Sequence, residues 1–227
     1  MLKLLESIRE PITNRPLSRK IFNTLIIFMI GVIFGLGSKV LDLVDLSYID
    51  SLFLYYDLGA FFSRISIWLL LALVISVVSK TPLRAGLNVF MFFVGMMLSY
   101  YGLLYIIKGA FPEKVIMFWS ILALISPFLA VPCWYAKGKG ILAISLSSII
   151  VSVFFVLAFA FDNYSDGFRL RHFGMEMINW LISIGVLYNN PKQIGYIIGL
   201  SSIIGIIIRW VYILFLQGKL DLWVVQL

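Results

Sequence analysis

Long apolar runs separated by short polar turns dominate this sequence. Five runs, each of about the twenty residues that cross a ~30 Å hydrocarbon core as a helix, cover positions 21–40, 59–79, 86–107, 115–136 and 141–161. In lipid, a spanning segment must satisfy its backbone hydrogen bonds internally, which a helix does. The pattern therefore predicts an all-α fold, a polytopic bundle of transmembrane helices.

Two further runs leave the number of spans open. Residues 173–188 form a short apolar run and residues 193–217 a longer one, joined by a polar turn. We expect seven spans, with 173–188 as the sixth. The alternative is six spans, with that segment lying flat at the membrane surface as an interfacial helix. Residues 21–217 are then one transmembrane domain, followed by a short tail at 218–227.

The charged residues predict the orientation of the chain. The first twenty residues are basic and begin with an amphipathic pattern, so residues 1–20 are expected to lie on the cytoplasmic surface. With the N-terminus inside, the inner segments hold ten lysines and arginines and the outer ones five, while seven of the eleven acids fall outside. Positive charge favours the cytoplasmic side, so the N-terminus is predicted to be cytoplasmic.

Composition narrows the class of protein further. The chain has 227 residues, is 62% hydrophobic and only 13% charged, whereas soluble domains are about half apolar and a quarter charged. The net charge of +7 is spread over short turns, so the expected partner is the lipid bilayer and not nucleic acid. A single cysteine (Cys133) and a single histidine (His172) exclude a metal cluster of these ligands, and no cofactor is expected. No catalytic motif is present, so the protein is not expected to be an enzyme.

The run at 115–136 carries two prolines five residues apart, Pro127 and Pro132. Each proline removes a helix hydrogen bond, which a membrane helix tolerates where hydroxyls or neighbouring helices satisfy the freed carbonyl. The two prolines are hinge candidates for alternating access, with a fixed kink as the alternative. Trp134 and Tyr135, which follow them, are expected at the headgroup level.

Small and amide side chains predict close helix contacts. Gly31 and Gly35, and again Gly195 and Gly199, have the small-xxx-small spacing that lets two membrane helices approach. Asn88, near the inner end of its run, is expected to form an interhelical hydrogen bond.

Polar residues recur at helical spacing in the sixth run. His172, Glu176, Asn179 and Ser183 are separated by four, three and four residues, which puts them on one face of a helix. If the sixth and seventh runs fold as an antiparallel hairpin, Arg209 comes within reach of Glu176. A Glu176–Arg209 ion pair is therefore predicted.

The ionisable residues inside apolar runs are the candidates for function. A charge within a bilayer costs at least ~2.5 kcal/mol, so it faces a partner or a wet cavity. One interpretation is a polar vestibule, open to the outside, that admits a solute or ion. The other is a structural ion pair, with an arginine that extends to the interface. The candidate pathway residues are Arg64, His172, Glu176, Asn179, Ser183 and Arg209.

Two strings in the sequence carry a resemblance. Arg84-Ala-Gly-Leu-Asn-Val-Phe90 and Cys133-Trp-Tyr-Ala-Lys-Gly-Lys-Gly140 resemble segments of an uncharacterised family of small bacterial multi-pass membrane proteins, a domain of unknown function. The resemblance covers the second to fifth spans. It implies a bacterial inner (plasma) membrane and no particular activity.

Two functions are consistent with these features. The first is a transporter or permease of a small solute or ion, acting alone, as a homodimer or as a subunit of a larger membrane system. The second is a non-transporting interaction or regulatory subunit, held to its partner by the small-residue faces at Gly31/Gly35 and Gly195/Gly199.

Overall fold

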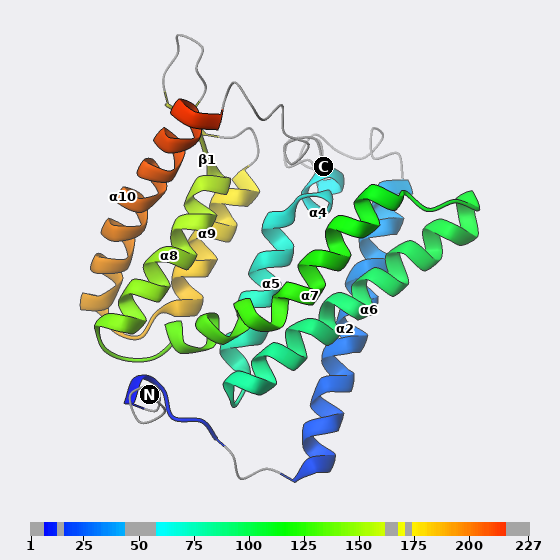
Figure 1. The fold of residues 1–227 in the computed structure, drawn as a ribbon, viewed down its shortest axis with the longest axis horizontal. Helices are drawn as coiled ribbons and strands as arrows, with labels where there is room; N and C mark the ends of the chain where they lie inside the picture. The colour runs from blue at the N-terminus through cyan, green and yellow to red at the C-terminus, as the bar shows by residue number, and fades with distance from the viewer. Residues whose placement is uncertain (1–6, 13–15, 44–57, 162–167, 171–173, 217–227) are drawn as a thin grey trace. The chain divides into compact units, whose positions relative to one another are not determined.

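The described part of the chain is almost entirely helical (Figure 1). The computed structural model describes residues 7–12, 16–43, 58–161, 168–170 and 174–216. Within them, five helices are long and apolar enough to cross a membrane, and three are shorter. The long helices are α2 (Leu17–Leu43), α6 (Pro82–Lys108), α7 (Glu113–Ala136), α8 (Ile141–Ala158) and α10 (Pro191–Leu216). The shorter ones are α4 (Leu58–Ser63), α5 (Ile65–Val78) and α9 (Gly174–Leu187). The prediction of an all-α fold with apolar helices long enough to cross a membrane is confirmed, and the fold is consistent with a membrane protein.

The predicted runs coincide with helices, with two differences. The run at 59–79 is divided into α4 and α5 by a bend at Arg64, where the sequence placed the only charge in that run. The run at 141–161 ends its helix at Ala158, because Phe159 adopts an extended backbone. Strand β1 (Phe159–Phe161) then pairs antiparallel with β2 (Phe168–Leu170), a short ladder that hydrophobic periodicity did not predict. His172, residues 44–57 and the tail at 218–227 lie outside the described residues.

The chain divides into two compact units. Unit 1 contains residues 1–48 and 71–135, and unit 2 contains residues 49–70 and 136–227. Each unit is described by itself below.

Glycines bring α2 and α6 together in unit 1. A methyl group on Gly31 would collide with the carbonyl oxygen of Phe92, and one on Gly35 with Ser99 and Met96. From the other side, Gly95 lies against the carbonyl of Phe28 in the same way. The predicted close contact at Gly31 and Gly35 is therefore confirmed, and the contacting helix is α6.

A polar network joins the helices of unit 1 at one end. Thr24 of α2 donates to Asn88 of α6 at 2.8 Å, which is the predicted interhelical hydrogen bond. The amide of Asn88 in turn donates to the hydroxyl of Ser79, just after α5, at 3.0 Å. These side chains are buried, so each hydrogen bond offsets the cost of removing a polar group from water.

The N-terminal segment of unit 1 packs on this same end. The guanidinium of Arg9 lies 4.4 Å from the ring of Trp134 and donates to the carbonyl oxygens of Trp134 and Val77, each at 2.8 Å. Burial lowers the pKa of Arg9. Trp134 is 1% exposed, and its indole donates to Ser79 at 2.8 Å. The ring of Trp134 is therefore covered by Arg9, and its expected level at the headgroups stays a prediction.

Helix α7 continues through both of its prolines. Pro127 cannot donate to the carbonyl of Ala123, and the hydroxyl of Ser126 donates to that carbonyl instead, at 2.8 Å. A methyl group on Gly86 of α6 would lie 3.0 Å from the carbonyl oxygen of Pro127, so α6 packs tightly where the proline lies. The freed carbonyl is therefore satisfied as expected for a membrane helix.

In unit 2, α8 lies between α9 and α10, alongside both (Figure 1). Gly205 of α10 packs against the ring of Phe155 of α8. At one end, the ammonium of Lys137 donates to the carbonyl of Val186 in the last turn of α9 (2.6 Å) and to that of Tyr188, just after this helix. Asn189 donates back to the carbonyl of Lys137 at 2.9 Å. The start of α8 and the end of α9 are therefore fixed together, and the two helices run antiparallel.

The helices expose large apolar side chains. On α2, Leu25, Met29 and Ile33 are more than half exposed, and on α7 Leu124 and Phe128 are 63% and 76% exposed. Extensive apolar surface of this kind marks contact with a membrane or a partner. Together with helix length, it supports a membrane-embedded protein.

The contact between α2 and α6 gives a direct test. Gly31→Ala should lower the free energy of unfolding by about 1–3 kcal/mol, because the methyl group overpacks against backbone atoms of α6. Gly37→Ala is the matched control, since no atom of another described segment lies within 4 Å of a methyl group there. Thermal unfolding in detergent, followed by tryptophan fluorescence, should show a lower midpoint for the first variant only. Equal midpoints would contradict the contact.

Candidate functional site

The candidate site in unit 2 begins at the break between α4 and α5. Arg64 occupies the break, and its backbone amide donates back to Phe61 at 3.2 Å. Trp68 of α5 is 2% exposed, and its indole donates to the carbonyl of Phe62 at 2.9 Å. This bond spans the interruption and satisfies a carbonyl near the end of α4. The break is thus a defined turn held by a buried tryptophan.

An ion pair links this break to α9. The guanidinium of Arg64 donates to Oε1 of Glu176 at 2.6 Å. The Glu176 side chain is 2% exposed and that of Arg64 is 23% exposed. Glu176 lies in the first turn of α9, where the positive end of the helix dipole also stabilises a carboxylate. The charge on Glu176 is therefore compensated from two directions.

A second polar contact lies one turn along α9. The amide of Asn179 donates to the hydroxyl of Ser66 at 2.9 Å, and both side chains are 2% exposed. Ser183, a further turn on, is fully buried and donates to the carbonyl of Trp180 at 2.7 Å. The predicted stripe of Glu176, Asn179 and Ser183 therefore faces the protein interior, and its first two members bridge to the segment around Arg64.

One atom of this cluster lacks a protein partner. Within the described residues, Oε2 of Glu176 is buried and accepts no hydrogen bond. A buried carboxylate oxygen without a donor is costly, so such an atom is available to a cation or to a hydrogen-bond donor of a solute. The cluster thus combines a fixed cation, a partly satisfied anion and a neutral amide.

The predicted partner of Glu176 was wrong. Glu176 pairs with Arg64, and Arg209 lies half-buried on α10. The expected hairpin assumed that the last two helices pack on each other, but α10 packs mainly on α8, which lies between them. Arg64 was itself a candidate pathway residue, but it was not expected to be the partner of Glu176. The guanidinium of Arg64 is held by Glu176, whereas the alternative was an arginine that extends by itself to the membrane interface.

Other candidates fall outside this cluster. Pro127 and Pro132 belong to unit 1, and His172 lies outside the described residues. The sequence analysis did not predict roles for Ser66 and Trp68. The position of Ser66, two residues after the only charge in an apolar run, could have indicated that its hydroxyl belongs to the polar cluster. Among the described residues, no three His, Cys, Asp or Glu side chains form a group that could hold a metal ion.

Comparison with protein-family models, with curated proteins and with solved structures finds no match for this chain. The resemblance to an uncharacterised bacterial family therefore stays a prediction.

The ion pair can be measured by a double-mutant cycle. Arg64→Met and Glu176→Gln should each lower the free energy of unfolding, because each single variant leaves one charge unpaired. The double variant should therefore lose about 1–3 kcal/mol less than the sum of the two single losses. The free energy of unfolding in detergent is the measurement. As a control, Arg209→Met combined with Glu176→Gln should show a smaller coupling. A larger coupling to Arg209 than to Arg64 would contradict the observed pairing.

Proposed function

We propose that this chain is a small transporter or permease-like protein that handles a small solute or ion at the Arg64–Glu176 pair. The observation that carries the proposal is the buried Glu176, with one oxygen on Arg64 and the other without a donor among the described residues. Ionisable residues within membrane segments usually mark substrate or ion pathways.

The broken helix supports the same function. In lipid, a non-helical backbone is tolerated only where it is buried in protein or lines a wet cavity. Transporter binding sites are commonly built at such discontinuous helices. Here the charged residue lies at the break itself, and Asn179 and Ser66 provide neutral hydrogen-bonding groups one turn away.

The topology that goes with this function has seven spans and a cytoplasmic N-terminus in a bacterial inner membrane. Support for a sixth span comes from α9 running antiparallel to α8, with its end fixed to the start of α8 by Lys137 and Asn189. A helix lying flat on the surface would not align with α8 in this way. The basic residues Lys137, Lys139 and Lys192 cluster at that end, which fits the cytoplasmic side.

The second candidate is a non-transporting interaction or regulatory subunit, either in a homodimer or bound to another membrane protein. Gly195 and Gly199 of α10 favour it, because no atom of the described chain lies within 4 Å of a methyl group at either position. That face can accept a closely packed helix. Gly31 and Gly35 no longer support it, since α6 occupies them.

Transport can be tested with purified protein in liposomes. Solid-supported-membrane currents and a pH-sensitive dye would be recorded against gradients of protons, sodium, potassium, chloride and small amino acids. The wild-type protein should give flux with one of these classes. Glu176→Gln should reduce it by about tenfold or more, equivalent to roughly 1.4 kcal/mol. Glu113→Gln, the same substitution at an exposed residue, should leave it unchanged.

The same samples discriminate the second candidate. If wild-type protein gives no flux with any class, and Gly199→Leu abolishes its dimerisation or its co-purification with a membrane partner, the interaction role replaces transport. Equal flux in the Glu176→Gln and wild-type proteins would remove Glu176 from the pathway.

A further inference from the structure

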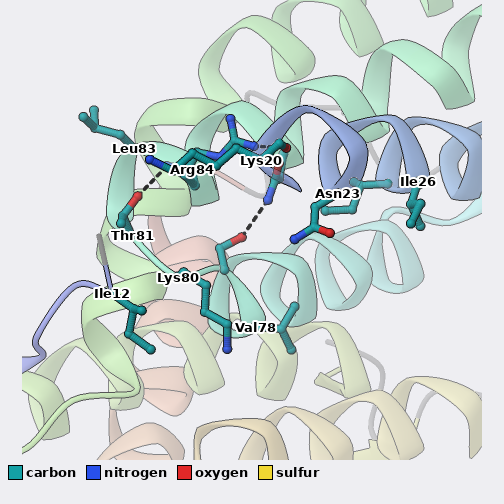
Figure 2. Close-up of a pocket in the computed structure, with 12 residues that line it drawn as sticks. Ile12, Lys20, Asn23, Ile26, Val78, Lys80, Thr81, Leu83 and Arg84 are labelled. Carbon is teal, nitrogen blue, oxygen red and sulfur yellow. Dashed lines mark hydrogen bonds between the residues drawn. The ribbon is translucent and has the colours of Figure 1, made fainter. Parts of the chain in front are cut away.

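Unit 1 has a basic cavity at the end where α2 and α6 begin. It has a volume of about 410 Å³ and lies between the first turns of these two helices, the end of α5 and Ile12 (Figure 2). Three cationic residues line it: Lys20, Lys80 and Arg84. No acidic residue is among the described residues of its lining. The cavity therefore favours an anion.

Arg84 is held in place on the wall of the cavity. Its guanidinium donates to the carbonyl of Lys20 and to Thr24, and its backbone amide donates to the hydroxyl of Thr81 at 3.2 Å (Figure 2). By contrast, no described residue accepts a hydrogen bond from the ammonium group of Lys20 or Lys80. These two lysines can turn toward a ligand without breaking a hydrogen bond to a described residue.

The rest of the lining is aliphatic. Ile26, Val78 and Leu83 line the cavity and are 43%, 60% and 82% exposed. A small soluble anion would gain nothing from contact with this aliphatic surface. A molecule with an anionic head and hydrocarbon chains fits both parts.

The depth of the cavity fits the same ligand. Helices α2 and α6 have 27 residues each, so each is ~40 Å long, against ~30 Å for the hydrocarbon core. Their ends therefore reach the level of the lipid headgroups, where basic pockets between helices bind anionic lipids.

We infer that this cavity binds an anionic phospholipid. Its phosphodiester lies among Lys20, Lys80 and Arg84, and its acyl chain lies along Ile26 and Val78. A zwitterionic lipid is disfavoured, because no described carboxylate in the lining can pair with its ammonium group. The site adjoins Asn88 and Ser79 of the buried network, so bound lipid should also stabilise unit 1. This inference does not depend on the transport proposal.

The test is native mass spectrometry of the full chain with an equimolar mixture of phosphatidylglycerol and phosphatidylcholine. The wild-type protein should retain phosphatidylglycerol preferentially. Two lysines near a charged headgroup contribute about 1 kcal/mol each, so Lys20→Gln with Lys80→Gln should weaken that preference by roughly 10- to 30-fold. Lys20→Arg with Lys80→Arg keeps both charges and should preserve it.

A matched control separates the cavity from general surface charge. Lys139→Gln with Lys192→Gln removes two exposed lysines from unit 2 and should leave the preference intact. Equal loss in both glutamine pairs, or no loss in either, would overturn the inference. Displacement of the lipid by millimolar inorganic phosphate would assign the site to a soluble anion and overturn it as well.

Discussion

The ion pair between Arg64 and Glu176 is the interaction on which unit 2 depends. In an apolar environment, neither charge is tolerated without the other, so the pair fixes α9 against the break between α4 and α5. The Asn179–Ser66 hydrogen bond keeps the same two segments in register one turn away. The pair is also incomplete, because Oε2 of Glu176 has no described donor. Glu176 is therefore half of a structural ion pair and also a carboxylate whose second oxygen has no described donor.

Unit 1 satisfies its polar groups more completely. Thr24, Asn88 and Ser79 form a chain of buried hydrogen bonds across three elements, and Ser126 satisfies the carbonyl that Pro127 frees. Glycine contacts let α2 and α6 approach closely enough for this network to form. The units therefore differ in structure: within the described residues, unit 1 has a basic cavity at one end, whereas unit 2 contains the carboxylate with one unsatisfied oxygen.

The sequence predicted the features that depend on the periodicity of hydrophobic and small residues. It did not predict the contacts that depend on which helices are neighbours in the fold. Run length located the helices, glycine spacing predicted the Gly31 contact, and helical spacing placed Glu176, Asn179 and Ser183 on one buried face. The partner of Glu176 could not be predicted, because it depends on α8 lying between α9 and α10, and periodicity carries no information on neighbours. The burial of Trp134 under Arg9 could not be predicted for the same reason, since Arg9 is far away in the sequence. The β1–β2 ladder is too short to give a hydrophobic pattern of its own.

In the proposed topology, α9 crosses the membrane and ends on the cytoplasmic side, beside the segment that leads into α8. Sidedness of labelling tests this most directly. In a Cys133→Ser background, single cysteines at Lys192, Lys139 and Lys108, all exposed, would be treated with a membrane-impermeant maleimide. In intact cells, only the cysteine at Lys108 should react, and the other two should react after permeabilisation. Labelling at Lys192 in intact cells would contradict the account.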